Sequence, residues 1–312
     1  MAEIARPTAA RRRTSGLRWR EYRDGYLFIA PWLVGFVLFT AGPMIASIVL
    51  TFFEWELIVP PRFVGFDNFV KLTQDGYVGI ALYNTAYYTF LAVPLHLLTA
   101  LVAALALNLR IHFINYYRTV YYLPSVTPAV ASALLWTYVY NPQYGLANAL
   151  LEFFGLPGQG WIFDPDLAKP SFILMSVWSL GSAMVVFLAG LQGIPQHLYE
   201  AAEIDGAGTL GRFRYVTLPM LTPIIFFNLV MGIIGSFQVF TAAYIITNGG
   251  PADATLFYVL YLFRNAFQFF KMGYASALAW LLFLIIMAFT LLQLKLANRW
   301  VYYEGELRKI EG

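Results

Sequence analysis

Side chains suited to acid–base or metal chemistry are scarce in this sequence. Its 312 residues include three histidines and no cysteine. The histidines, His96, His112 and His197, are widely scattered. The lack of cysteine excludes disulfides, thiolate metal sites and cysteine nucleophiles. A membrane-embedded enzyme would need clustered His, Asp or Glu, so this function class is disfavoured.

Neutral polar side chains within apolar stretches are the candidates for a ligand path. They are Ser125, Trp178, Ser182, Ser236 and Gln238. Hydroxyl, amide and indole groups suit a neutral, hydroxyl-rich ligand, although interhelical hydrogen bonds would explain the same residue types. His96 is the one His, Asp, Glu, Lys or Arg in these stretches. A lone histidine there is more often a packed or capped residue than part of an ion pathway.

The elements that must position these groups are apolar helices. The chain is 60% hydrophobic and 12% charged, whereas soluble domains have about 25% charged residues. A helix needs about 20 apolar residues to cross a bilayer. Six stretches without Asp, Glu, Lys or Arg meet this need, near 26–53, 82–107, 119–140, 171–191, 221–247 and 275–294. We therefore predict an all-α polytopic membrane protein with six transmembrane helices, the first kinked near Gly42-Pro43.

Positive residues orient these helices. With six crossings, fifteen Lys and Arg fall on the side of both termini and five on the other side, which predicts cytoplasmic termini. The expected divisions are an Arg-rich cytoplasmic tail (1–25), a transmembrane domain (26–303) that contacts lipid, and a short cytoplasmic tail (304–312). The apolar run 256–263 is too short to span and is expected to be interfacial or re-entrant. The net charge of +3 is too small to indicate nucleic acid.

One segment between two apolar stretches, residues 195–219, is polar and interrupted by glycine. Glycine permits the left-handed turn that stops a helix, so a first short helix should end at Asp205-Gly206. Thr209 can cap a second short helix, and Leu218-Pro219 should turn the chain back into the membrane. The prediction is a helix–Gly–helix elbow with small residues that allow close approach by a partner protein.

The elbow sequence, EAAEIDGAGTLGRFRYVTLP, resembles the signature of permease subunits in binding-protein-dependent ABC importers. The matching positions are Glu200-Ala201-Ala202, Gly206 and Leu218-Pro219, with Val216 in place of the usual Ile. GLQGIPQHLYEAA and TNGGP (247–251) are similar to the carbohydrate branch, TNGGP to the first of the two maltose-type permease classes. The likeness covers residues 26 to 303.

This resemblance implies a type I ABC importer permease fold in which the elbow is a coupling helix. The docking residues for a cytoplasmic ATPase dimer would be Glu200, Ala201, Ala202, Asp205, Gly206, Ala207, Leu218 and Pro219. The residues implied to contact an extracellular solute-binding protein are Asn248, Gly249, Gly250 and Pro251. A second homologous permease and a bacterial inner membrane complete the implied assembly.

The same resemblance implies a sugar as substrate and no enzymatic activity in this chain. The sequence has no G-x-x-x-x-G-K-[ST] phosphate loop, so ATP and Mg²⁺ would be bound by the partner ATPase and this chain would carry no cofactor. Two alternatives remain: a permease of the same family for a polyol or glycerol-phosphate, and an ion-coupled secondary carrier. The identity of the sugar stays open.

Overall fold

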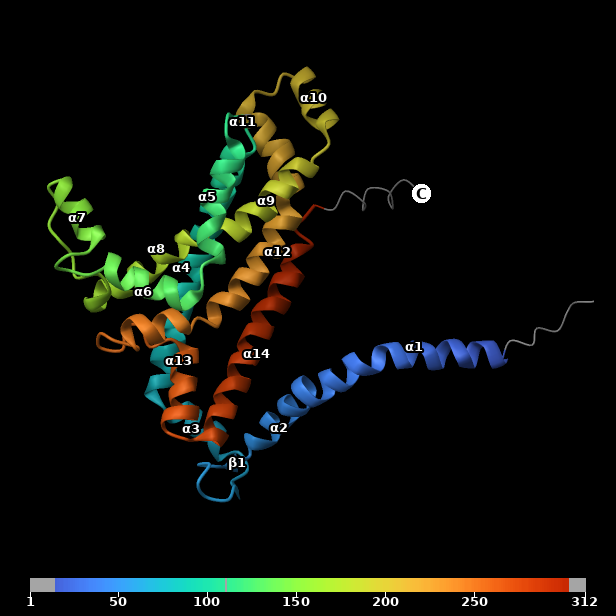
Figure 1. Cartoon of the computed structure of the whole chain (residues 1–312), viewed down its shortest axis with the longest axis vertical. Coiled ribbons are helices and arrows are strands. Elements are labelled where there is room, and N and C mark those ends of the chain that lie inside the picture. The colour runs from blue at the N-terminus through green and yellow to red at the C-terminus, as the bar shows by residue number, and fades with distance from the viewer. Residues whose placement is uncertain (1–14, 110, 303–312) are drawn as a thin grey trace, which may run out of the picture.

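A computed structural model describes residues 15–109 and 111–302 of the chain, and these form an all-helical molecule with one small hairpin (Figure 1). The elements in chain order are α1 (Ser15–Phe36), η1 (Val37–Ala41), α2 (Gly42–Leu50), β1 (Phe53–Glu54), β2 (Arg62–Phe63), α3 (Asp67–Gln74), α4 (Gly76–Leu107), α5 (Ile114–Val126), α6 (Ala129–Val139), α7 (Leu146–Phe153), η2 (Trp161–Phe163), α8 (Pro165–Trp178), α9 (Gly181–Gly193), α10 (Gln196–Ile204), α11 (Thr209–Arg212), η3 (Phe213–Thr217), α12 (Leu218–Phe237), η4 (Ala243–Thr247), α13 (Tyr258–Phe263), η5 (Arg264–Gln268) and α14 (Met272–Ala297).

The first apolar helix continues past Gly42-Pro43, where a kink is predicted. Its α1 part extends away from the other helices (Figure 1). A π-helical turn, η1, precedes Gly42-Pro43, and its last hydrogen bond joins the Gly42 N–H to the Val37 carbonyl. The wider turn carries the chain past a proline whose ring would press on the carbonyl four residues earlier in a regular helix. The side chains of α1 are mostly exposed, and α2 contacts α14.

The bundle is organised around α4, which contacts α8, α9, α12 and α13. The largest fully buried side chains of the bundle include Phe172, Phe237, Phe257 and Tyr258. The Tyr258 hydroxyl donates to the Leu278 carbonyl at 2.9 Å, which satisfies a polar group that would be costly to bury alone. The apolar run 256–263, expected to be interfacial or re-entrant, packs between α4 and α14 in the core.

Four described helices are long and apolar enough to cross a membrane, and five if α8 and α9, bent by 47°, form one span. The stretch 119–140 lies instead in two shorter helices, α5 and α6. Thr127, between them, has an extended backbone, as expected for a residue before a proline such as Pro128. The stretch 221–247 is also interrupted, because α12 ends at Phe237 and η4 begins at Ala243. The six-span division stays a prediction.

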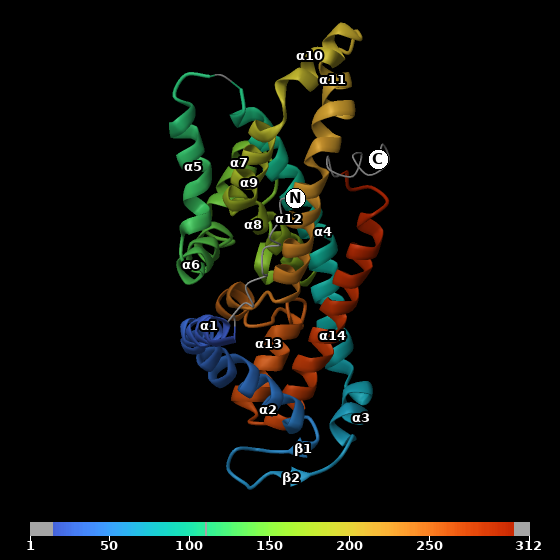
Figure 2. The ribbon, with the colours of Figure 1, turned by 90° about the vertical axis from the view of Figure 1, so that its right-hand side faces the viewer.

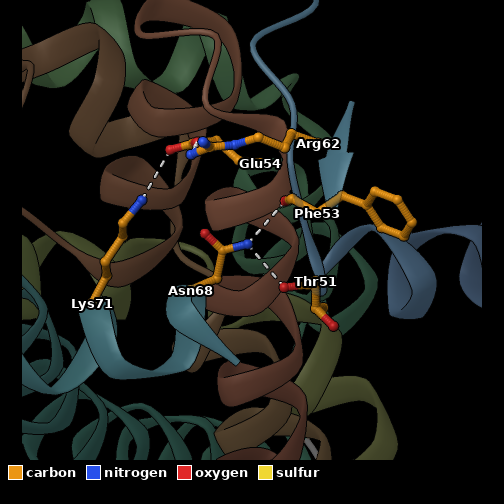
Figure 3. A network of polar contacts seen from close by, with 6 residues as sticks. All are labelled: Thr51, Phe53, Glu54, Arg62, Asn68 and Lys71. Atoms are coloured by element: carbon orange, nitrogen blue, oxygen red, sulfur yellow. Dashed lines mark hydrogen bonds and ion pairs between the residues drawn. The ribbon is translucent and has the colours of Figure 1, made fainter. Parts of the chain in front are cut away.

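A polar brace fixes the end of the molecule that carries the hairpin (Figure 3). The buried Asn68 amide on α3 donates to the carbonyls of Thr51 and Phe53, both at 2.9 Å. Glu54 pairs with Arg62 at 2.6 Å and with Lys71 at 3.1 Å, and these hydrogen bonds hold the pKa of Glu54 below its usual range. Exposed ion pairs contribute little, so the buried Asn68 amide is the stronger polar link between α3 and the segment that follows α2.

The two ends of the bundle carry different structures. Figure 2 shows α10 and α11 at one end and β1, β2 and α3 at the other. Close to the turn between α4 and α5, the Arg118 guanidinium donates to the carbonyl of Leu107, the last residue of α4, at 3.1 Å. A cation at a helix carboxyl end is stabilised by the helix dipole, so Arg118 has a structural role beyond its contribution to topology.

Candidate functional site

A cavity of about 510 Å³ lies among α4, α6, α8, α9 and α12. Three of the predicted path residues, Trp178, Ser182 and Ser236, line it. Its other polar lining residues are Tyr88, His96, Ser132, Ser176, Ser179 and Asn228. No Asp, Glu, Lys or Arg is among its lining residues. The cavity therefore offers hydroxyl, amide, imidazole and indole groups to a ligand, and no fixed charge.

Two predicted path residues are not part of this cavity. The Ser125 hydroxyl on α5 donates to the Tyr122 carbonyl at 2.7 Å. Gln238 follows the end of α12, is exposed, and donates to the Ile234 carbonyl at 3.0 Å. Both side chains bond to the backbone of their own segment, which is a common arrangement for polar residues in membrane helices.

The break between α8 and α9 places Trp178 and Ser182 at the cavity. Gly181 begins α9 where this helix crosses α5, and a Cβ there would lie 2.7 Å from the Tyr121 carbonyl oxygen and 2.8 Å from the Tyr122 Cα. Only glycine allows such a close approach of two backbones. Trp178 meets Trp136 edge to face, with ring centroids 6.0 Å apart, a favourable geometry for aromatic pairs.

Several lining residues were not predicted, although their spacing contains a signal. On α4, Tyr88, Ala92 and His96 repeat every four residues, and on α12 the spacing of Asn228, Gly232, Gly235 and Ser236 is i, i+4, i+7, i+8. Such spacing places residues on one helix face. A stripe of small and polar residues on an otherwise apolar helix therefore marks the cavity face.

The elbow begins with the predicted short helix, α10, and Gly206 ends it as expected. Gly206 has φ +80. The Ala207 N–H bonds to the Ala202 carbonyl at 2.9 Å, and the Gly206 N–H bonds to the Glu203 carbonyl at 3.0 Å. This pair of bonds is a Schellman motif, which satisfies the last carbonyls of a helix and requires a left-handed residue.

The second half of the elbow differs from the prediction. Thr209 begins a continuous helix that runs to Phe237, and it does not cap that helix through its side chain. Leu218-Pro219 does not turn the chain. Pro219 is accommodated because a π-helical turn precedes it, in which the Leu218 N–H bonds to the Phe213 carbonyl. This is the arrangement found before Pro43.

Hydrogen bonds between the two halves of the elbow and packing on the bundle hold the elbow in place. The Tyr199 and Thr217 hydroxyls hydrogen-bond at 3.0 Å, and Arg212 pairs with Glu203 at 3.5 Å. Leu198, Tyr199 and Val216 pack on the cluster that includes Leu191 and Ile194. The inner face of the elbow is therefore anchored, so its outer face is presented on a fixed support.

The outer face of the elbow is exposed. Ile204 is 88% exposed and Leu210 is 79% exposed, and Glu200 and Ala201 are exposed beside them. Of the other predicted docking residues, Asp205 and Gly206 are exposed, whereas Ala202, Ala207, Leu218 and Pro219 are half-buried. Exposed apolar residues next to an acid are typical of an interaction surface.

The loop that contains residues 248–251 is braced from within. The Arg264 guanidinium donates to the Asn248 carbonyl, and the Thr255 hydroxyl donates to the Gly250 carbonyl at 2.6 Å. Gly249 is buried, and Asn248 is exposed. Asn248 is therefore the residue of this loop whose side chain is most available to a partner.

Comparisons with known proteins agree with this architecture. Residues 82–302 match the family described as binding-protein-dependent transport system inner membrane component. The chain is 46% identical to the probable ABC transporter permease protein YesP of Bacillus subtilis, over 90% of this chain and 93% of YesP. It is 33% identical to the trehalose/maltose transport system permease protein MalF of Thermococcus litoralis, over 91% of this chain and 97% of MalF.

A solved structure shares the fold. One chain of a bacterial alginate ABC transporter, crystallised with a pentasaccharide-bound periplasmic protein, superposes with a TM-score of 0.78 at 24% identity, over 90% of this chain and 97% of that one. The relatives are permeases and not enzymes. This chain therefore belongs to the family of inner membrane components of binding-protein-dependent transport systems, as a multi-pass ABC transporter permease.

Proposed function

We propose that this chain is the transmembrane subunit of an ATP-driven importer that moves a sugar through the cavity among α4, α6, α8, α9 and α12. The observation that carries the proposal is the chemistry of the cavity wall, which has hydroxyl, amide, imidazole and indole groups and no Asp, Glu, Lys or Arg. These groups complement the hydroxyls of a sugar. The naming of a similar permease for trehalose and maltose supports the same substrate class.

The cavity disfavours glycerol-phosphate as the substrate and an ion-coupled mechanism. Glycerol-phosphate would need a cation, because a phosphate group is expensive to desolvate without one, and the lining contains neither Lys nor Arg. An ion-coupled carrier is expected to place several ionisable residues along the path, and among the described lining residues His96 stands without Asp, Glu, Lys or Arg. A polyol remains chemically compatible and is a member of the substrate panel below.

ATP hydrolysis is proposed to reach this chain through the elbow. Its outer face combines Glu200 with the exposed Ile204 and Leu210, while its inner face is anchored to the bundle. A force applied to an anchored surface is transmitted to α12, because Thr209–Phe237 is one continuous helix. We therefore assign the outer face to a cytoplasmic ATPase dimer that binds ATP and Mg²⁺.

The remaining partners follow from exposed surfaces and charge. Most apolar side chains of α1 between Trp19 and Phe36 are exposed, and this helix extends away from the bundle (Figure 1). We assign these side chains to lipid and to a second, homologous permease. Arg212 and Arg214 lie at the end with α10, so by the positive-inside rule we assign this end to the cytoplasm of a bacterial cell. Six crossings would put both termini on the same side. An extracellular solute-binding protein would then dock near Asn248.

A substitution in the cavity tests the proposed path. Trp178→Ala should lower uptake roughly five- to 150-fold at low sugar concentration, the loss expected when a hydrogen-bonding partner of the bound sugar is removed. Gln238→Ala is the matched control, since Gln238 lies outside the cavity, and it should transport normally. The assay is uptake into proteoliposomes that contain the complete transporter.

The ligand for this assay is chosen by a thermal-shift screen of the solute-binding protein against trehalose, maltose, lactose and the polyol glycerol. The compound that gives the largest shift is the probe sugar. Normal uptake by Trp178→Ala at concentrations well below saturation would remove Trp178 from the path. A loss in Gln238→Ala equal to that in Trp178→Ala would show that the cavity does not define the path.

A further inference from the structure

His96 has two different surroundings at its two ring nitrogens. Its Nδ1 lies 2.9 Å from the Ser176 carbonyl oxygen. A carbonyl oxygen only accepts hydrogen bonds, so Nδ1 must carry the hydrogen. In the neutral ring Nε2 is then an acceptor. No residue in the described part of the chain hydrogen-bonds to Nε2, and His96 lines the cavity.

The Ser176 carbonyl can accept the hydrogen bond from His96 because the helix is interrupted between α8 and α9. In a continuous helix this carbonyl would accept from the Leu180 N–H. Here the Leu180 N–H bonds to the Val177 carbonyl at 3.3 Å, so the Ser176 carbonyl loses its helical partner. His96 and, more weakly, the Ser179 hydroxyl at 3.3 Å replace that partner. The bond to Ser176 therefore fixes the orientation of the imidazole ring.

Three serine hydroxyls of the cavity wall are also committed as donors. Ser176 donates to the Ile173 carbonyl at 2.6 Å, Ser179 to the Ser176 carbonyl, and Ser236 to the Ile233 carbonyl at 3.0 Å. A serine hydroxyl has one hydrogen and two lone pairs. What these three serines offer to the cavity is therefore lone pairs, which complement a ligand that donates hydrogen bonds.

We propose that His96 is a substrate-binding residue, with Nε2 accepting a hydrogen bond from a sugar hydroxyl while Nδ1 holds the ring on the Ser176 carbonyl. Among the described residues of the cavity wall, no charged side chain faces His96, and Tyr88 is the other titratable group. This inference rests on the proposed function, because it concerns the same cavity. It adds a specific contact from α4, at the point where α8 is broken.

Two substitutions of His96 distinguish the role of Nδ1 from the role of Nε2. The amide of Asn can donate near the position of Nδ1 but does not reach the position of Nε2, whereas the longer amide of Gln places a polar group near Nε2. His96→Asn should raise KM for the probe sugar about tenfold, the usual value of one hydrogen bond. His96→Gln should stay closer to wild type. The assay is uptake by the complete transporter in proteoliposomes, with co-purification of all subunits as the check of assembly.

Monodeoxy analogues of the probe sugar identify the contacted hydroxyl. One analogue should be transported with a KM about tenfold higher than the parent sugar by the wild type, and with no such difference by His96→Asn. A purely structural His96 predicts the reverse order of the variants, with His96→Asn normal and His96→Gln impaired. That order, an unchanged KM in His96→Asn, or deoxy penalties that persist in His96→Asn would overturn the proposal.

The outcome also distinguishes this inference from the proposed function. If Trp178→Ala is impaired and His96→Asn has a normal KM, the cavity is the path and His96 is not a binding residue. If both variants and Ser236→Ala transport normally, the proposed path itself is wrong.

Discussion

Glu200→Arg is expected to detach the ATPase from this chain and abolish uptake, while leaving membrane insertion intact. Glu200 is exposed on α10 and has no hydrogen-bonded or ion-paired partner among the described residues. If its carboxylate pairs with a cation in a partly desolvated ATPase cleft, removal of one member of the pair costs roughly 3–5 kcal/mol. An open surface pair would be worth about 0–1 kcal/mol. A like charge in the cleft adds repulsion to this loss.

Co-purification of the ATPase with each variant, followed by uptake, measures this effect. The matched control is Glu152→Arg, which makes the same charge change at an exposed position on α7. It should retain both the ATPase and uptake. Retention of full ATPase binding and uptake by Glu200→Arg would refute the docking role. Rescue by an acidic substitution in the ATPase cleft would show direct pairing.

Gly235→Trp is expected to block uptake by filling the cavity. Gly235 lines the cavity on α12, and a Cβ at this position would meet no atom within 4 Å. A larger side chain can therefore enter the cavity without displacing the backbone. An indole ring would occupy space that the sugar needs, while Gly235→Ala should transport nearly as well as wild type.

The control for helix tolerance is Gly79→Trp, because Gly79 is exposed on α4 outside the cavity and a Cβ there would also meet no atom within 4 Å. Uptake at saturating sugar and co-purification of the ATPase are compared for the three variants. Loss of uptake with normal co-purification in Gly235→Trp alone supports the path. Wild-type uptake by Gly235→Trp would place the sugar elsewhere.

Features determined by neighbouring residues could be predicted from the sequence. The end of α10 at Gly206 depends on one glycine and the preceding helix, and the motifs around it indicated the family. The all-helical architecture followed from long stretches without charge, because a bilayer leaves few alternatives for the backbone.

Features determined by tertiary packing could not be predicted in the same way. Pro219 indicates a turn by local rules, and the π-helical turn before it keeps the helix continuous. The burial of 256–263 depends on its contacts with α4 and α14. His96 gained its hydrogen-bond partner from a break in another helix, 80 residues away in sequence.

ATP-driven sugar uptake is the most direct measurement of the central claim. Proteoliposomes would contain this chain with its second permease and ATPase, and would receive the probe sugar with the solute-binding protein. We predict uptake that requires ATP and every subunit, and no ATP hydrolysis by this chain purified alone, because its sequence has no phosphate loop. Uptake by this chain alone, driven by a proton gradient and independent of ATP, would contradict the account.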